Sequence, residues 1–169
     1  MTVKSLEDLF VHSLSDISNA EKQLTKALPK LLRAATQPEL KAAFEANMDA
    51  TQGRIERIDQ AVEKTGLRLR RIKCAAMEGL VEEGKEQIEE VEKGAVLDSA
   101  LIAAAQKIAH YEIATYGTLC ALAKHLDYTD AGKQLHLSLE ESKAIDAELT
   151  ILAQRGNAEE QTTSKKVAA

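Results

Sequence analysis

The sequence predicts an all-α protein: four long helices in a bundle, with a long, partly helical crossover between the second and third. Apolar residues recur at steps of three and four over four long stretches, the spacing of one helix face. Only two prolines occur in 169 residues, so long helices are permitted. Aromatic residues make up 3% and Trp is absent, which leaves Leu, Ile and Ala to form a closely packed helical core. The length suits one domain with its own core.

The first two predicted helices span residues 5–35 and 36–64. In the second, Thr36 is the expected N-cap, and Glu39 three residues later would complete a capping box. Gly66 fits the C-terminal stop, since glycine readily takes a left-handed conformation. The apolar stripe of the first helix is Leu6, Phe10, Leu14, Ile17, Glu21, Leu24, Leu28 and Leu31.

Residues 66–94 form the predicted crossover, with some helix of its own. A connection of this length lets the second and third helices run parallel. The third and fourth helices are expected at 96–126 and 130–154. The chain is polar from Arg155 onward, so we expect a bundle over 1–154 and a disordered tail over 155–169.

Charge and cysteine content limit the classes of partner. The net charge is −5 and the pI is about 5.5, which argues against nucleic acid as the main partner. The one basic run, Arg68 to Lys73, is expected to be a solvated connection. Apolar runs fall short of the roughly 20 residues that cross a bilayer, and the N-terminus lacks signal-peptide character. Cys74 and Cys120 are far apart, so we expect reduced thiols in a cytoplasmic protein with no membrane contact.

Three carboxylates fall on or beside the apolar stripes of three different helices. Glu21 lies on the stripe of the first helix, Glu112 on that of the third, and Glu141 beside that of the fourth. Each is near the middle of its helix, so all three could meet at one depth. A buried carboxylate must be paired, protonated or bound to a metal. Hard and borderline metal ions need clustered oxygen ligands of this kind.

The second helix offers a different partner for these carboxylates. Its inward positions are Asn47, Thr51 and Arg54, with no carboxylate or imidazole among them. No Glu-x-x-His motif occurs in the chain, and the four histidines are expected outside the site. The Arg54 guanidinium could therefore reach inward and neutralise the glutamates. Tyr116, one turn from Glu112, could donate a hydrogen bond to it.

Several segments carry a family resemblance: Ala20–Leu28, Ile55–Gln60, Lys73–Leu80, Ala103–Lys107, His110–Ala114 and Tyr116–Leu119. Over about residues 5–153 the sequence resembles the YciF branch of the YciE/YciF family of bacterial stress-response proteins, within the ferritin-like superfamily. The resemblance implies a ferritin-like four-helix bundle, a homodimer induced under stress, and a di-metal centre like that of rubrerythrins. Relatives tend to place Glu where this chain has Ala50 and Ala109, and His or Gln where it has Arg54.

Two functional hypotheses follow. In the first, Glu21, Glu112 and Glu141 bind iron, as a di-iron centre or otherwise, or manganese, for peroxide- or oxygen-linked redox chemistry; the redox partner and any catalytic residue stay unknown. In the second, the protein is a metal-free structural or partner-binding helical dimer, and Arg54 neutralises the buried glutamates. Whether the protein is an enzyme is left open by the sequence.

Overall fold

A computed structural model describes the backbone of residues 2–167 and the side chains of residues 2–156. Within that part the chain is all-α, with no strand. Its helices are α1 (Leu6–Ala34), α2 (Pro38–Thr65), α3 (Ala75–Glu90), α4 (Ala95–His125) and α5 (Thr129–Val167). The predicted fold class and the partly helical crossover are confirmed.

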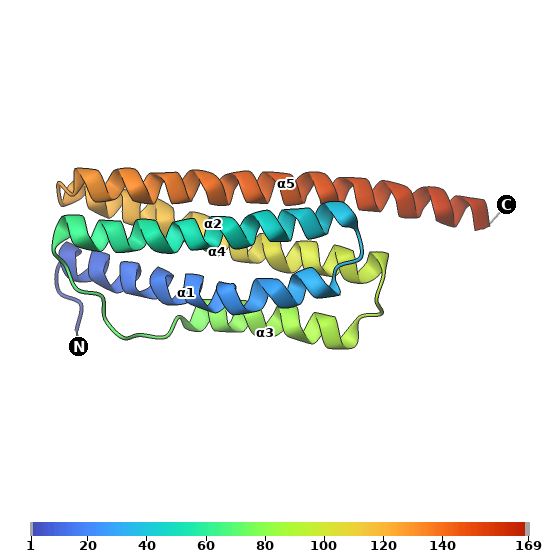
Figure 1. Cartoon of the computed structure of the whole chain (residues 1–169), viewed down its shortest axis with the longest axis horizontal. Coiled ribbons are helices and arrows are strands. Elements are labelled where there is room, and N and C mark those ends of the chain that lie inside the picture. The colour runs from blue at the N-terminus through green and yellow to red at the C-terminus, as the bar shows by residue number, and fades with distance from the viewer. Residues whose placement is uncertain (1, 168–169) are drawn as a thin grey trace.

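The four long helices form two antiparallel pairs, α1 with α2 and α4 with α5 (Figure 1). The segment between α2 and α4 returns along the bundle, so α2 and α4 run in the same direction, as predicted (Figure 1). α3 packs against α1 and α4, on the side of the bundle away from α5 (Figure 1). One face of α1 and of α4 is therefore covered by the crossover instead of solvent.

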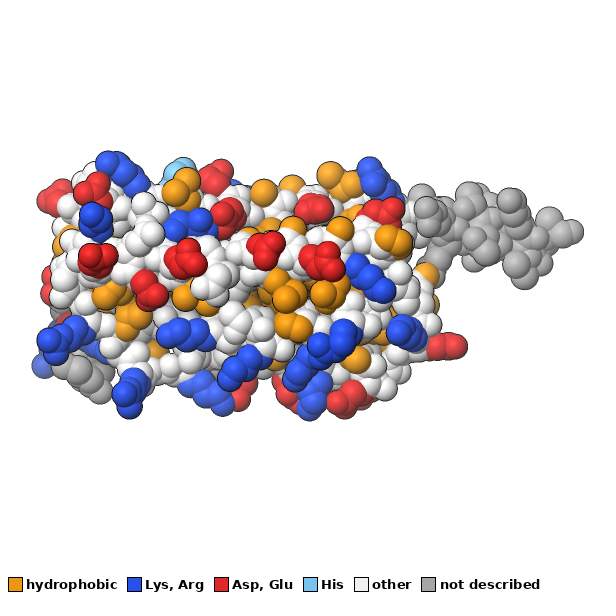
Figure 2. Space-filling model, in the orientation of Figure 1, with side chains coloured by type: hydrophobic (Ala, Val, Ile, Leu, Met, Phe, Trp, Pro, Cys, Tyr) orange, Lys and Arg blue, Asp and Glu red, His pale blue; other side chains and the backbone are white. Residues whose placement is uncertain are grey.

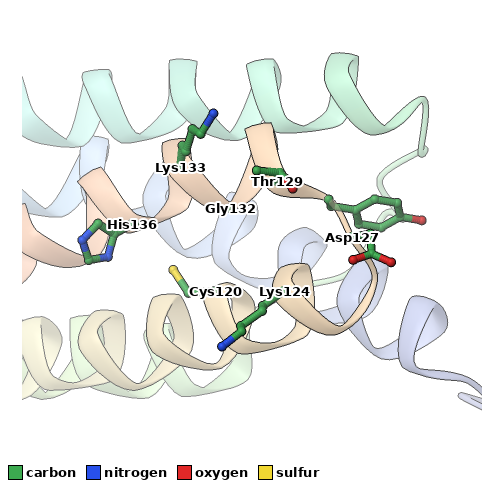
Figure 3. Close-up of a pocket in the computed structure, with 8 residues that line it drawn as sticks. Cys120, Lys124, Asp127, Thr129, Gly132, Lys133 and His136 are labelled. Carbon is green, nitrogen blue, oxygen red and sulfur yellow. The ribbon is translucent and has the colours of Figure 1, made fainter.

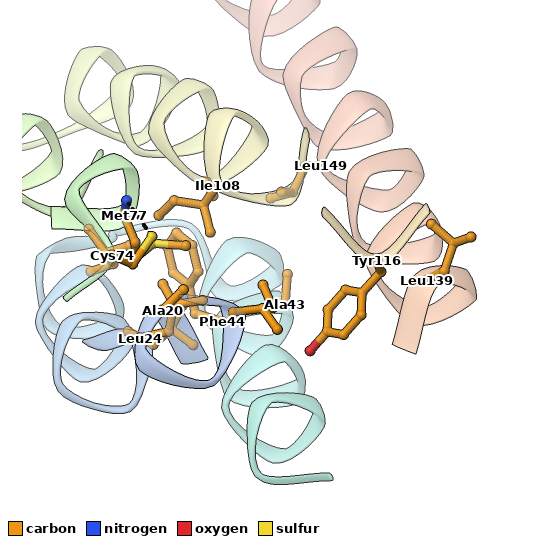
Figure 4. Packing of buried hydrophobic residues seen from close by; sticks show 14 of the residues in the cluster. Ala20, Leu24, Ala43, Phe44, Cys74, Met77, Ile108, Tyr116, Leu139 and Leu149 are labelled. Carbon is orange, nitrogen blue, oxygen red and sulfur yellow. Dashed lines mark hydrogen bonds between the residues drawn. The ribbon is translucent and has the colours of Figure 1, made fainter. Parts of the chain in front are cut away.

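The core is built from small aliphatic side chains, with few aromatic ones. Ala20 and Leu24 of α1, Phe44 of α2 and Met77 of α3 pack together where these helices meet (Figure 4). All four are at most 1% exposed. Small residues let helix backbones approach closely, and burial of each larger side chain stabilises the fold by about 1.5–3 kcal/mol.

Two apolar residues of α4 that lie off its main stripe, Ile108 and Leu122, are buried within the single chain. From the sequence alone, such residues could form a second apolar face for another chain. Ile108 and Leu122 are 3% and 7% exposed and belong to the single-chain core. The α4 face therefore gives no support to a dimer, because the chain's own helices already bury it.

Two helix ends follow from local chemistry, and one of them, Gly66, was predicted. Ser5 caps α1, its hydroxyl accepting a hydrogen bond from the backbone N–H of Asp8. Gly66 ends α2 in the left-handed conformation, at φ 68°, and its N–H donates to the carbonyl of Val62. A residue with a side chain would be strained at that φ, which confirms Gly66 as the stop.

The predicted capping box at the start of α2 is wrong. The N-cap is Gln37, and its side chain makes no capping hydrogen bond. Asp98 of α4 does the capping from across the bundle: its carboxylate accepts from the backbone N–H groups of Thr36 at 2.7 Å and Gln37 at 3.0 Å, and from the Thr36 hydroxyl. A tertiary contact replaced the local motif, which no local pattern could reveal.

We expect Asp98→Ala to lower the free energy of unfolding by about 1–3 kcal/mol. Asp98 is 2% exposed, so its removal leaves backbone N–H groups without an acceptor and with little access to water. Chemical denaturation measures the loss. Asp130→Ala is the control, because its ion pair with Lys133 is exposed and should contribute at most about 1 kcal/mol. Equal stability of the two variants would contradict the capping role.

α5 continues as one helix past residue 154 to Val167. The predicted tail at 155–169 lies almost wholly outside the residues whose side chains are described, so its disorder stays a prediction. No helix in the described chain is both long enough and apolar enough to span a bilayer.

Candidate functional site

A charged cluster lies in the centre of the bundle, where α1, α2 and α4 contribute one charged residue each. Arg54 of α2 is fully buried, as is Glu21 of α1, and Glu112 of α4 is 1% exposed. The Arg54 Nε donates to Glu21 Oε1 at 2.9 Å, and its Nη2 donates to Glu112 Oε1 at 3.1 Å. One guanidinium therefore bridges two buried carboxylates, and the predicted pairing of Arg54 with these glutamates is confirmed.

Two further side chains of α2 hold the guanidinium in place. Arg54 Nη2 also donates to Asn47 Oδ1 at 3.1 Å and to Thr51 Oγ1 at 2.9 Å. These residues precede Arg54 by seven and three positions, so they lie on the same face of the helix. The polar side chains on the inward face of α2 therefore position the Arg54 cation.

Two hydroxyl groups complete the cluster around the carboxylates. The Tyr116 hydroxyl donates to Glu21 Oε1 at 2.7 Å, so the predicted bond to Glu112 is wrong. Ser142 of α5 donates to Glu112 Oε2 at 3.2 Å. Ser142 was missed by sequence reasoning. The available signal was its spacing of four from Ser138, which puts two small, fully buried polar residues on one face of α5.

Glu141 does not join this cluster. Its side chain is 38% exposed and forms an ion pair with Arg57, which also donates to the Ser138 hydroxyl at 3.0 Å. The expectation that three carboxylates meet in the interior is therefore met by two, Glu21 and Glu112. The reason is the position of Glu141 around the axis of α5. Glu141 lies beside the apolar stripe of this helix, and the next residue, Ser142, occupies the buried position.

The balance of charge shifts the titration of the cluster. Burial, then the neighbouring Glu21, raises the pKa of Glu112 to about 8 against the opposing effect of Arg54. Burial likewise raises the pKa of Glu21. Burial alone would lower the pKa of Arg54, but the negative charges of Glu112 and Glu21 outweigh the effect of burial and raise this pKa. Arg54 therefore stays charged, and its single charge does not compensate two carboxylates, so the pair of acids retains a proton near neutral pH.

The residues present do not fit a ferritin-type di-metal centre. Such a centre uses a Glu from each of two helices and Glu-x-x-His from the other two. Here Arg54 places a fixed positive charge between Glu21 and Glu112, and Ala50 and Ala109 supply no oxygen. Across the described side chains, no group of three or more His, Cys, Asp or Glu could hold a metal ion.

Comparison with known proteins identifies the chain. Residues 5–162 match the model of the domain of unknown function DUF892. The chain is 56% identical over 154 residues to protein YciF of Escherichia coli K12, covering 90% of this chain and 93% of that protein. It belongs to the YciF family. The predicted family resemblance is thereby confirmed.

Two solved structures share the fold of this YciF-family protein. The crystal structure of the E. coli stress protein YciF matches with a TM-score of 0.90 at 55% identity, over 92% of this chain and 98% of that one. YcfI of Rhodopseudomonas palustris, described as a candidate structural protein, matches with a TM-score of 0.85 at 41% identity, over 88% and 94%. The bundle is therefore shared across bacterial members of the family.

The two cysteines do not supply a reactive centre to this member of the YciF family. Cys74 is buried, and burial raises the pKa of its thiol. Its Sγ lies 3.1 Å from the Tyr111 hydroxyl, which donates to Asp16 at 2.6 Å. Burial also raises the pKa of Cys120. Nucleophilic cysteines need a lowered pKa, so neither thiol is activated.

Cys120 borders a surface hollow of about 440 Å³ at the turn between α4 and α5 (Figure 3). Lys124, Lys133 and Asp127 also line it. The side chains of Lys124 and Lys133 point in opposite directions (Figure 3). Lys133 also forms an ion pair with Asp130. The hollow therefore has charges of both signs that do not point at a common position, and no class of ligand matches this arrangement.

Proposed function

We propose that this protein is a metal-free structural or partner-binding helical dimer that acts in the bacterial stress response, in the cytoplasm. One observation carries the proposal: the Arg54 guanidinium lies between Glu21 and Glu112 and makes the contacts that a metal ion would otherwise make. A cation that belongs to the chain cannot exchange or change its redox state. The cluster then serves to fix the register of three helices, not to perform chemistry.

The descriptions of two relatives are compatible with this proposal. E. coli YciF is described as a stress protein, and YcfI of R. palustris as a candidate structural protein. The stress role proposed here is carried over from the first relative, and the structural role from the second.

Association with a second copy could bury apolar residues on the outer face of α5. Leu137 and Ile151 are 53% and 49% exposed. They are 14 residues apart, close to four helical turns, and so lie on one side of the helix. Contact with another chain along this side of α5 would remove both side chains from water.

A second candidate, binding of iron or manganese at Glu21, Glu112 and Glu141, is favoured by one feature. The Oε2 atom of Glu21 is buried and has no hydrogen-bond partner in the described structure, and neither has Nη1 of Arg54. An unpartnered buried carboxylate oxygen is a potential ligand. Metal binding would require Arg54 to leave the cluster and Glu141 to leave Arg57.

Metal content separates the two candidates. We expect protein purified without chelators to hold only trace iron and manganese per chain, and to gain none when Fe²⁺ is added under anaerobic conditions. Elemental analysis by mass spectrometry measures both. Arg54→Gln is the informative variant, since it removes the internal cation but keeps a polar side chain. Stoichiometric metal in the wild-type protein would overturn the metal-free function.

A further inference from the structure

The basic run between α2 and α3 is a largely solvated connection, as expected, and it also forms one wall of a cleft. The opposite wall is α1. The cleft has a volume of about 500 Å³. On the α1 side its lining residues are Ser15, Ser18, Asn19 and Lys22, and on the other side they run from Leu69 to Lys73. Their spacing of three and four residues places the α1 members on one helix face.

The two walls are joined at both ends by hydrogen bonds. The backbone N–H of Arg70 donates to the Ser15 hydroxyl at 2.9 Å, and that of Cys74 donates to Asn19 Oδ1 at 2.9 Å. Arg70 is further tied to Asp8 by an ion pair at 3.0 Å. The residues between these anchors are therefore held at a fixed distance from α1, so the cleft is pre-formed. A pre-formed site saves the entropy of ordering a loop on binding.

The charge of the cleft has one sign. Four of its lining residues are cationic (Lys22, Arg70, Arg71 and Lys73), and none is acidic. Arg70 and Lys73 are paired with carboxylates outside the cleft, whereas Lys22 and Arg71 form no ion pair within the described residues. The protein as a whole has a net charge of −5, so this concentration departs from its average. Blue side chains gather over α1 and the connecting segment, and red ones over α2 (Figure 2).

A polar side chain without a hydrogen bond to the described part of the protein also lines the cleft. Ser18 is 6% exposed, and its hydroxyl makes no hydrogen bond to any described residue. A helical serine usually bonds a carbonyl of the preceding turn, as Ser15 does with Val11 at 2.5 Å. A free donor at the floor of a cationic cleft is suited to an anionic oxygen.

We propose that this cleft binds the phosphate group of a small phosphorylated molecule, with Lys22, Arg71 and the Ser18 hydroxyl as its ligands. Arginine, lysine and hydroxyl donors together match the oxygens of a phosphate. The volume exceeds that of inorganic phosphate alone, and the half-buried Leu69 and Ile72 give the cleft apolar wall for an attached organic group. This site is separate from the Arg54 cluster, so it stands or falls independently of the function proposed above.

Calorimetric titration of the full chain with inorganic pyrophosphate at physiological salt tests the site. We expect saturable binding of one equivalent, weakened by about tenfold or more in Lys22→Gln/Arg71→Gln and by a smaller factor in Ser18→Ala. Lys26→Gln is the matched control. It removes an exposed cation one turn further along α1 that does not line the cleft, and should leave affinity within about twofold.

The remaining outcomes each overturn the proposal. Absence of saturable pyrophosphate binding does so, as does equal weakening by Lys26→Gln, which would mean diffuse attraction to the charged face. Binding of duplex DNA or of phosphatidylglycerol vesicles without binding of pyrophosphate would assign the face to a macromolecule or membrane instead. Lys22 and Arg71 are exposed, so melting curves of the double variant should match the wild type and exclude misfolding as the cause.

Discussion

Arg54→Ala is expected to destabilise the protein by about 3–5 kcal/mol at pH 7.5, the largest effect of any single substitution considered. Arg54 is the only cation among the described side chains that contacts Glu21 and Glu112, so the change leaves both buried carboxyl groups without it. It also leaves a cavity, because Arg54 is the largest fully buried side chain in the described structure. Urea denaturation followed by circular dichroism measures the loss.

Arg57→Ala is the matched control for this effect. Arg57 lies one turn away, with a side chain 16% exposed, and its partner Glu141 is 38% exposed. Water therefore screens this pair, and its removal should cost no more than about 1 kcal/mol. If the two arginine variants were equally stable, or if Fe²⁺ restored Arg54→Ala to wild-type stability, the structural role of Arg54 would be rejected in favour of metal binding.

A triple variant tests whether stability depends on having buried charges at all or on pairing each buried carboxylate with a cation. Replacing Glu21 and Glu112 by Gln and Arg54 by Met removes all three charges at similar side-chain volume. Buried ionic groups replaced together by neutral ones are often neutral or stabilising, whereas removal of one partner is strongly destabilising. The triple variant should therefore be more stable than Arg54→Ala, although it lacks more of the native contacts.

The fold was predictable because its determinants are periodic. Helix faces repeat every three or four residues, and Gly66 stops α2 by its own conformational freedom. The start of α2 was not predictable, since its cap is Asp98, 60 residues further along the chain. The burial of Ile108 was not predictable for the same reason. Periodicity shows that this residue is apolar and lies off the stripe, but not that α3 packs over it.

The site was predictable in outline and not in its pairing. Glu21 and Arg54 were assigned inward positions from their stripes, and both are buried. Whether Glu141 or its neighbour Ser142 faces the core depends on the rotation of α5 by one residue, about 100°. Apolar stripes define a face with less accuracy than that, so a carboxylate at the edge of a stripe can pair at the surface instead.

Stability should depend on pH through the same cluster. The pKa of Glu112 is raised from its ordinary value of 4.5 to about 8 in the folded protein. Between these values the folded state holds a proton that the unfolded chain has lost. The resulting stabilisation is full below the lower value and disappears as the pH rises through the upper one, with a slope of at most about 1.4 kcal/mol per pH unit for one proton.

Glu112→Gln should therefore be more stable than the wild type at pH 8, by roughly 2 kcal/mol or more, and nearly equal to it at pH 5. Its amide oxygen can still accept from Arg54, its amide group can still meet the Ser142 hydroxyl, and Arg54 is left with Glu21 as a balanced pair. Denaturation curves from pH 5 to 8 measure the difference between the two proteins, in which the titration of histidines elsewhere cancels. Glu141→Gln, which alters a carboxylate outside the cluster, should retain the wild-type slope. A wild-type slope in Glu112→Gln would mean that Glu112 is already ionised at neutral pH, and Arg54 would then have to compensate both carboxylates at once.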